Sequence, residues 1–176
     1  MTTIEKNTHR QHVHAFRAQM RHFIMTSRFN NATLEENHSF RRQNPKIGCV
    51  YCSPSKIAEH VPIDSIMFIL EMNNDTNRIE GIGMVKNHPY ANKYAVYKNG
   101  NYNRYVYTGK HRIDRSTMTE EEEKIMTVFD VFCFTGNRHL KRGQGIKSFP
   151  PETLYRCSRT MDLVAFMANM FKQRIH

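Results

Sequence analysis

Apolar and polar positions alternate with a helical period near the start of the chain. Five apolar side chains fall on one stripe at i, i+3, i+7, i+10 and i+11: Val13, Phe16, Met20, Phe23 and Ile24. This stripe predicts an amphipathic helix over residues 8–29, with Thr8 as its N-cap and Asn30-Asn31 at its end. Residues 30–46 are polar and basic, which predicts a loop.

From Ile47 onward the apolar pattern becomes that of strands. The predicted strands cover residues 47–52, 65–72, 78–86, 94–97, 102–107 and 129–134. The turn formers at 73–77 make a hairpin of the second and third strands, and Lys98–Asn101 makes another turn. Gly81 and Gly83 predict a bulge or a close backbone approach. Thr117 or Thr119 caps a short helix over the acidic run 119–124, and a last helix covers about 152–173.

These elements predict an α+β fold. Five or six strands with short connections favour a small, strongly curved antiparallel or mixed β-barrel, flanked by N- and C-terminal helices. No linker divides the chain, so residues 1–176 form a single domain. Its parts are a basic N-terminal helix and loop (1–46), a β-rich barrel core (47–150) and a C-terminal helix (151–176).

The longest apolar run, Ile66–Leu70, is far shorter than the roughly 20 residues that span a bilayer. Residues Met1–Lys6 contain no apolar segment of a secretory signal. We therefore expect a soluble, intracellular, non-secreted protein with no membrane partner, in which the four cysteines are reduced thiols.

The pair Cys49 and Cys52 has CxxC spacing, and His60, Cys133 and His139 offer further zinc ligands. A second CxxC or an HxxxH is missing from the sequence. In a strand, residues three apart point to opposite faces, which disfavours joint ligation. The pattern favours core thiols and no metal site.

Charge narrows the choice of partner. The chain has 26 Lys and Arg against 16 Asp and Glu, a net charge of +10. Such an excess favours a polyanionic partner, foremost nucleic acid, over a charge that serves solubility alone. Four arginines lie within roughly 40° of one another on the predicted helix and have no acidic residue at i±4: Arg10, Arg17, Arg21 and Arg28. Arg41 and Arg42 extend this basic segment into the loop.

Residues 90–115 hold six of the eight tyrosines. Aromatic rings stack on bases and cations pair with phosphates, so this mixture suits a platform for single-stranded nucleic acid. Tyr102 and Tyr105 are the stacking candidates, and the phosphate candidates of this segment are Arg104, Lys110, Arg112 and Arg115. The alternative is that most of these tyrosines fill the core.

Residues 137–147 form a basic loop that contains Gly143 and Gly145. Glycines let backbone N–H groups approach a phosphate, and four cations add charge: Arg138, Lys141, Arg142 and Lys147. The spacing matches neither a P-loop nor a dinucleotide fingerprint. We interpret the segment as a contact loop for a polymer, the alternative being a solvated turn.

Support for catalysis is thin. The sequence contains no nucleophile elbow, zinc-protease or deaminase motif. The acids Glu120–Glu123 complement a helix dipole. Asp130, Cys133 and His139 could be drawn together as a nucleophile set on sequence proximity alone. We predict no enzymatic activity and no cofactor.

Five strings of the sequence carry a resemblance: Gly48–Pro54, Ile66–Leu70, Gly81–Gly83, Asn101–Tyr107 and Lys141–Ile146. They resemble small uncharacterised basic proteins of giant DNA viruses, marseilleviruses among them, over about residues 47–150. The strand order and Gly-x-Gly hairpin are also similar to PUA-like barrels, the class with ASCH, EVE and YTH domains. That likeness implies binding of RNA or modified bases, in some members through an aromatic pocket. This chain has no tryptophan, so only tyrosine and phenylalanine could form such a pocket.

Together these observations predict a non-enzymatic nucleic-acid-binding protein of a large DNA virus, located in the host cytoplasm (a viral factory) or the virion. Binding would be largely independent of base sequence and sensitive to salt. The alternative is a virion structural or host-interaction protein whose basic surface docks onto an acidic protein. An enzyme acting on nucleic acid would require a carboxylate or histidine cluster within the basic groove.

Overall fold

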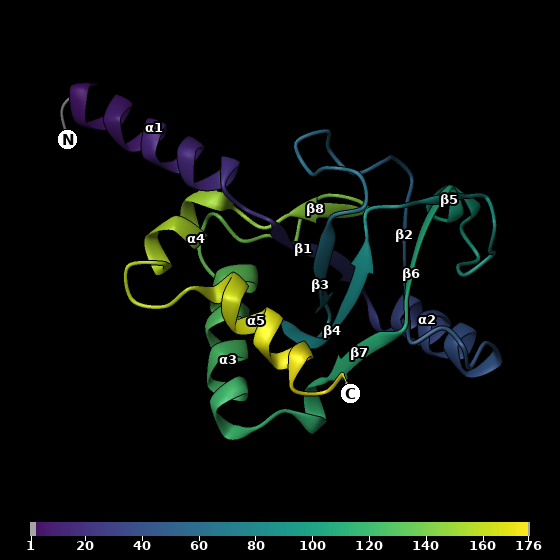
Figure 1. Ribbon diagram of the computed structural model, residues 1–176. Helices are drawn as coiled ribbons and strands as arrows, with labels where there is room; N and C mark the ends of the chain where they lie inside the picture. The colour runs from purple at the N-terminus through teal and green to yellow at the C-terminus, as the bar shows by residue number, and fades with distance from the viewer. Residues whose placement is uncertain (1–2, 176) are drawn as a thin grey trace.

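Two β-sheets form the centre of the computed structural model, which describes residues 3–175 (Figure 1). The five-stranded mixed sheet has the order β7 (His111–Asp114), β4 (Arg78–Lys86), β3 (Ile66–Asn73), β1 (His22–Phe29) and β8 (Ile146–Ser148). The three-stranded antiparallel sheet has the order β2 (Cys49–Ser53), β6 (Tyr105–Gly109) and β5 (Tyr90–Ala91). The α+β prediction is confirmed. The barrel is wrong, because both sheets among the described residues are open.

Five α-helices surround these sheets within residues 3–175. They are α1 (Thr3–Ala18), α2 (Asn31–Gln43), α3 (Glu120–Phe134), α4 (Pro151–Cys157) and α5 (Leu163–Lys172), with short 3-10 turns η1 (Gly100–Asn103) and η2 (Arg115–Thr117). Helices α3 and α5 cover one face of the large sheet, and α1 projects from the body beside α4 (Figure 1). None of the helices among these residues is long and apolar enough to cross a membrane.

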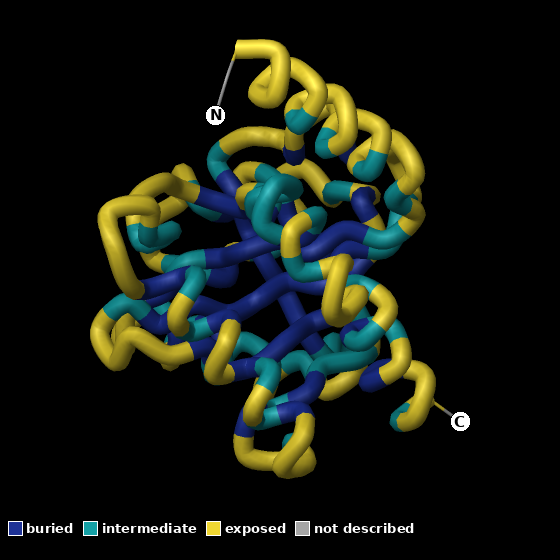
Figure 2. The backbone as a smooth tube through the Cα atoms, turned by 90° about the vertical axis from the view of Figure 1, so that its left-hand side faces the viewer, coloured by how far each residue is buried: buried dark blue, intermediate teal, exposed yellow. Residues whose placement is uncertain are grey.

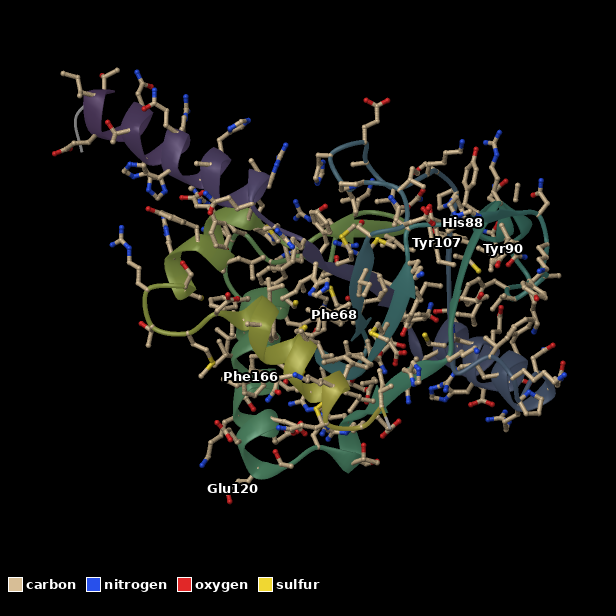
Figure 3. All side chains as sticks on the ribbon, viewed as in Figure 1. Phe68, His88, Tyr90, Tyr107, Glu120 and Phe166 are labelled. Carbon is tan, nitrogen blue, oxygen red and sulfur yellow. The ribbon has the colours of Figure 1, made fainter. Side chains whose placement is uncertain are left out.

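The large sheet is buried on both faces, because its strands alternate between two apolar layers. Phe68 and Leu70 point toward α3 and α5, where Phe68 stacks on Phe171 at 5.3 Å between ring centroids (Figure 3). Met67 and Ile69 point to the opposite layer, which contains side chains of the small sheet. The strands are accordingly the most buried part of the chain (Figure 2).

Glycines let the two sheets approach each other closely. A Cβ at Gly83 of β4 would overlap the ring of Tyr51 of β2. The β3–β4 register also shifts between Leu70 and Met72, at the level of Gly81. The predicted hairpin of residues 65–86, its turn at 73–77, and the close approach with a bulge are therefore confirmed.

The predicted helix over 8–29 is wrong. Helix α1 ends at Ala18, Thr8 lies inside it, and residues 22–29 form β1. The five residues from Phe23 to Ser27 are all buried, since β1 lies between β3 and β8 and is covered on both faces. An unbroken buried run is typical of a central strand, and pairing with two neighbours outweighs a periodicity that also suited a helix.

The predicted loop at 30–46 is also wrong, because residues 31–43 form α2. Asn30 caps this helix: its side chain accepts a hydrogen bond from Thr33 N at 2.8 Å, and Thr33 Oγ1 accepts one from Asn30 N at 3.0 Å. The helix is mostly polar because it buries only Leu34 and Asn37. A capping box followed by a weak apolar stripe was the available signal.

Four further elements differ from the prediction. Residues 129–134 belong to α3, whose predicted N-cap at Thr119 is confirmed, rather than to a strand. The last helix is divided into α4 and α5, and Asp162 caps the second. Residues 94–97 form no strand, and the strand expected at 102–107 begins only at Tyr105. The apolar run of α3 looked like a strand because an outward-facing Val131 stands among core residues such as Phe129 and Cys133.

Candidate nucleic-acid interface

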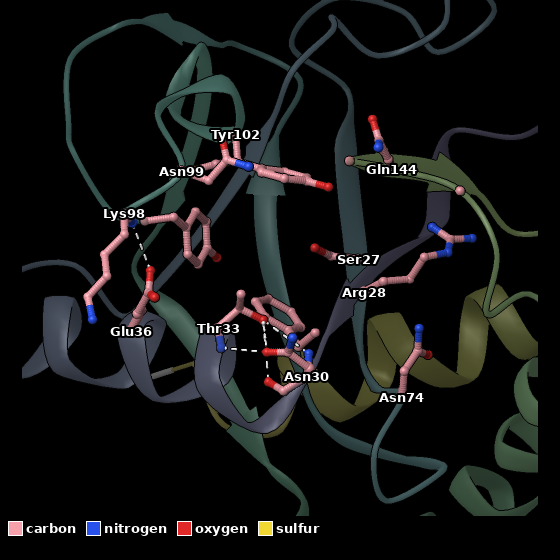
Figure 4. A pocket seen from close by; sticks show the side chains of 15 residues that line it. Ser27, Arg28, Asn30, Thr33, Glu36, Asn74, Lys98, Asn99, Tyr102 and Gln144 are labelled. Carbon is pink, nitrogen blue, oxygen red and sulfur yellow. Dashed lines mark hydrogen bonds between the residues drawn. The ribbon is translucent and has the colours of Figure 1, made fainter.

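A cavity of about 440 Å³ opens at one edge of the large sheet (Figure 4). Strands β1 and β3 are parallel, so their carboxyl ends meet at this edge and bring Arg28 and Asn74 together. Strand β8 runs antiparallel to β1, so residues 143–145, which precede it, reach the same edge. The topology thus gathers three segments that are far apart in the sequence.

The first turn of α2 and the segment 97–102 form the other walls. The N–H of Lys98 donates a hydrogen bond to Glu36 Oε2 at 2.9 Å, which ties the segment to the helix (Figure 4). The Oδ1 of Asn103 accepts hydrogen bonds from the backbone N–H of Val96 and Tyr97, at 3.0 and 2.9 Å. The buried amide of Asn103 thereby holds the segment in one conformation.

Two tyrosines line this wall. The ring of half-buried Tyr102 points into the cavity (Figure 4). The hydroxyl of Tyr97 accepts a hydrogen bond from Asn37 Nδ2 at 2.9 Å, and burial raises its pKa well above the usual value. Tyr97 is therefore a fixed part of the wall, whereas Tyr102 offers an aromatic surface to an occupant.

Two polar side chains of the cavity each use one atom to hold the loop after α3. The Nε of Arg28 donates to Leu140 O at 2.6 Å, and the Nδ2 of Asn74 donates to Lys141 O at 3.1 Å. Burial lowers the pKa of the Arg28 guanidinium. Arg28 Nη1 and Asn74 Oδ1 are buried and have no hydrogen-bond partner among the described residues. Both residues line the cavity, but these two atoms are themselves shielded from solvent.

The glycine loop predicted to contact phosphate forms the rim of this cavity, with Gln144 between its two glycines. Gly143 and Gly145 have φ of +110° and +67°, which is the left-handed region that favours glycine. A Cβ at Gly145 would also overlap Ser53 Oγ. Of the loop cations, Arg138, Arg142 and Lys147 are exposed and Lys141 is half-buried.

The predicted arginine stripe does not exist as one surface. Arg10 and Arg17 are exposed on α1, Arg21 is exposed before β1, and Arg28 lies in β1 at the cavity. Only Arg28 is brought to the aromatic wall. The spacing that suggested one stripe required a helix through residue 29, and the helix ends at Ala18.

The other predicted cations of the first segment lie in the last turn of α2. Arg41 donates a hydrogen bond from Nε to Asn37 Oδ1 at 3.1 Å, and Arg42 pairs with Glu35. Neither lines the cavity. Exposed Arg42 remains near solvent, whereas Arg41 helps to fix the amide that supports Tyr97.

Arg112 and Arg115 are interior groups, although both were predicted to contact phosphate. The side chain of Arg112 is 8% exposed and forms two hydrogen bonds with Glu71, at 2.9 and 2.7 Å, and one with Asp114 at 2.7 Å. Arg115 is 4% exposed and pairs with Glu123 and Asp130. Carboxylates already occupy these guanidinium groups, so neither is available to a ligand.

The remaining predicted residues surround Tyr105 at the start of β6. Exposed Arg104 and the ammonium of Lys56 each lie 5.9 Å from its ring centroid. Lys110 is exposed between β6 and β7. Tyr105 packs against the core layer between the sheets and does not line the cavity, so Tyr102 is the better placed of the two stacking candidates.

Sequence reasoning missed the amides of the cavity, namely Asn30, Asn74 and Asn99, as well as Tyr97. Asn30 and Asn74 each follow a strand of the parallel pair. The available signal was an asparagine pair after an apolar run, at Asn30-Asn31 and again at Asn73-Asn74. Only the parallel pairing of β1 and β3 shows that these two positions are neighbours.

Cys49, Cys52 and Cys133 are buried and Cys157 is half-buried. Cys49 and Cys52 lie on opposite faces of β2, in different apolar clusters, and burial raises the pKa of each to about 12. Asp130 is engaged by Arg115, and burial raises the pKa of Cys133 to about 12, which disfavours a nucleophile set there. Within residues 3–175 no three His, Cys, Asp or Glu side chains are placed to hold a metal ion.

Comparison with known proteins identified no relative of this chain. No family model, curated protein or solved structure matches the chain.

Proposed function

We propose that this protein binds single-stranded nucleic acid without catalysis, and that one unpaired base occupies the cavity beside Tyr102. The observation that carries the proposal is the meeting of Tyr102, Arg28 and the Gly143–Gly145 loop around one opening. None of the three is near the others in the sequence. The volume of about 440 Å³ falls within the range of small-molecule sites, roughly 300–1,000 Å³.

The chemistry of the wall suits a nucleobase. Aromatic side chains stack on the faces of unpaired bases, and amide and guanidinium groups bind their edges. Arg28 and Asn74 bring a guanidinium and an amide to the wall, and the Watson–Crick edge of an unpaired base presents both donors and acceptors. Exposed Arg142 and Lys147 next to the rim supply charge for the phosphates on either side.

The walls support binding rather than catalysis. Cys52 is buried with a raised pKa, and Glu36 accepts a hydrogen bond from the backbone of Lys98. The proposal includes the viral setting and the host cytoplasm or virion as its place, which rest on the sequence strings alone. Docking of an acidic protein, the alternative, becomes an outcome of the test.

The test is fluorescence anisotropy with labelled single- and double-stranded RNA and DNA. We expect single strands to bind more tightly than duplexes. Tyr102→Ala should weaken binding about 5- to 150-fold, because stacking on an aromatic side chain contributes about 1–3 kcal/mol per base. Tyr102→Phe keeps the ring and should stay close to the wild-type affinity.

The matched control is Tyr90→Ala, since Tyr90 is an exposed tyrosine outside the cavity that contacts His88 and Lys93. This change should leave the affinity within about twofold of wild type, as for a surface substitution. Equal losses for Tyr90→Ala and Tyr102→Ala would contradict the proposal. So would the absence of binding to any strand at near-physiological salt, which would favour a protein partner.

A further inference from the structure

A second recess, of about 740 Å³, lies between α1 and α4. Five basic side chains and one carboxylate line it: Lys6, Arg10, Arg138, Arg156, Arg159 and Glu152. They come from three separate segments, namely α1, the loop after α3, and α4 with the turn that follows it. The recess therefore exists only because α1 is placed against α4.

The recess has an uncompensated positive charge. Its one carboxylate, Glu152, already accepts a hydrogen bond from Arg156 Nη2 at 2.7 Å and contacts His9 Nε2 at 3.3 Å. A formal excess of four positive charges remains among the lining residues. Like charges gathered across a recess repel one another, and an anion bound between them removes that repulsion.

Helix α1 is weakly attached for a helix of 16 residues, since none of its residues is buried. Its contacts with α4 centre on Tyr155, which meets the rings of His9 and Phe16 edge-on at 5.8 and 5.6 Å. This small aromatic contact holds the cations of α1 opposite those of α4. Helix α1 projects from the body of the protein beside α4 (Figure 1). An anion that bridges the two helices would strengthen their contact.

The loop after α3 connects residues of the recess with residues of the cavity. Arg138 and Glu152 of the recess also line a neighbouring hollow that includes Leu140. The carbonyl of Leu140 accepts the hydrogen bond from Arg28, which lines the cavity. Arg138 and Gly143 are five residues apart, so their Cα atoms are separated by at most about 18 Å.

We propose that the recess binds the phosphate backbone of the same single strand whose base occupies the cavity. This inference rests on the proposed function. The strand passes from the cavity along residues 138–143 into the space between α1 and α4. The arginines are suited to this role because guanidinium groups pair with phosphate oxygens through two hydrogen bonds. The recess contributes affinity through charge, and the cavity contributes it through stacking.

The test compares single strands of about 5 and about 16 nucleotides, which bracket the usual site sizes of single-strand-binding folds. The variant R156Q/R159Q removes two exposed charges of the recess and leaves the cavity untouched. For the longer strand, we expect the slope of log affinity against log salt to fall by about 1.4 and the affinity at 0.1 M salt to fall on the order of tenfold. The shorter strand should bind R156Q/R159Q as it binds wild type.

The charge-matched control is K86Q/K172Q, which removes two exposed lysines outside the recess and the cavity. It should preserve the affinity for both strands. Circular dichroism and thermal unfolding of each variant show whether it remains folded.

The outcomes separate the two proposals. If Tyr102→Ala weakens both strands while R156Q/R159Q weakens neither, the proposed function stands and the recess proposal is overturned. An equal loss of affinity for both strands in R156Q/R159Q also overturns the recess proposal, because the recess residues would then influence binding at the cavity itself. If polyglutamate of equal charge displaces the long strand as well as a second strand does, the recess binds acidic chains in general and the proposal is wrong. If wild type binds neither strand, both proposals fall.

Discussion

Two groups of arginines in this protein lie in opposite environments. Arg112 and Arg115 are buried and paired with carboxylates, whereas Arg138, Arg142 and Arg159 are exposed on loops and turns around the cavity and recess. Both groups look alike in the sequence, where each stands among other basic residues. The difference teaches that a basic residue is available to a ligand only where the fold leaves its side chain exposed and does not surround it with carboxylates.

Strand pairing explains why one group of arginines is buried and paired and the other is exposed. Strand β7 pairs with β4, and β4 pairs with β3, so Arg112 of β7 lies across β4 from Glu71 of β3. Gly81 in β4 has no side chain to separate them: a Cβ there would lie 2.7 Å from Arg112 Nη2 and 2.9 Å from Glu71 Oε2. The loop cations have no such neighbour strand. Net charge alone cannot separate these two cases.

The largest expected effect comes from breaking the buried ion pair between Arg112 and Glu71. Arg112→Ala leaves the carboxylate of Glu71 buried with only the hydroxyl of Tyr51, at 2.7 Å, to stabilise it. Removing one partner of a buried ion pair costs about 3–5 kcal/mol, so the free energy of unfolding in urea should fall by that amount. The double variant Glu71→Gln/Arg112→Met should lose less unfolding free energy than Arg112→Ala, because neither member of the buried charge pair remains. A loss below 1 kcal/mol in R112A would show that the pair is not buried in solution.

A smaller effect is expected at the rim glycine. Gly145→Ala forces a side chain into a left-handed conformation and against Ser53 Oγ, which should cost about 1–3 kcal/mol of unfolding free energy. The altered loop should also weaken binding of a single strand, measured by anisotropy. Gly100→Ala is the control, since a Cβ there meets no atom within 4 Å. Normal stability and binding in G145A would contradict the role of the loop.

Low pH should destabilise the buried ion pairs of Arg112 and Arg115 and should not affect the exposed arginines. Burial alone would raise the pKa of Glu71, but the charge and hydrogen bonds of Arg112 outweigh it, so the pKa lies below 4.5. Hydrogen bonds from Arg115 and Arg174 likewise lower the pKa values of Glu123 and Glu122. Because the unfolded chain then binds more protons, stability is fully present above about pH 4.5 and is lost as pH falls through the folded values.

This acid dependence is measured by urea unfolding between pH 7 and pH 3. The free energy of unfolding of the wild type should be constant near neutral pH and should decrease below about pH 4.5. Glu71→Gln should lower the plateau and make the acid loss shallower, because one titrating group is gone. An identical slope in E71Q and wild type would show that Glu71 keeps an ordinary pKa in the fold.

The smallest effect is expected from a single exposed cation. Arg142→Gln should reduce the salt slope of single-strand binding by about 0.7 and leave the free energy of unfolding within about 0.5 kcal/mol. Lys124→Gln is the control, since Lys124 is an exposed cation on α3 that pairs with Glu120. Equal salt slopes for R142Q, K124Q and wild type would show that Arg142 makes no phosphate contact.

Local signals in the sequence predicted several features correctly. The turn formers at 73–77 predicted the β3–β4 hairpin, and Thr119 with the acids after it predicted the start of α3. Gly81 and Gly83 predicted a bulge or a close backbone approach, and both occur. Each of these features depends on residues within a few positions of one another, or on a backbone property of a single residue type.

The cavity could not be predicted because its parts meet only through long-range pairing. Tyr102 and the glycine loop were both identified as candidates, but nothing in their spacing indicated that they share one opening. The parallel pairing of β1 with β3 and the antiparallel pairing of β1 with β8 bring Arg28, Asn74 and the loop to one edge. A helix assigned through residue 29 removed β1, which carries Arg28 and lies between β3 and β8, so the site could not be assembled.

The sequence by itself determined the α+β class, the basic character and the residue types from which a nucleic-acid site can be built. The tertiary structure alone decided which cations are free, which tyrosine faces a cavity and where α1 lies. The physical reason is that composition and local pattern record what each residue can do. Pairing of distant strands decides which carboxylate, ring or solvent each side chain meets.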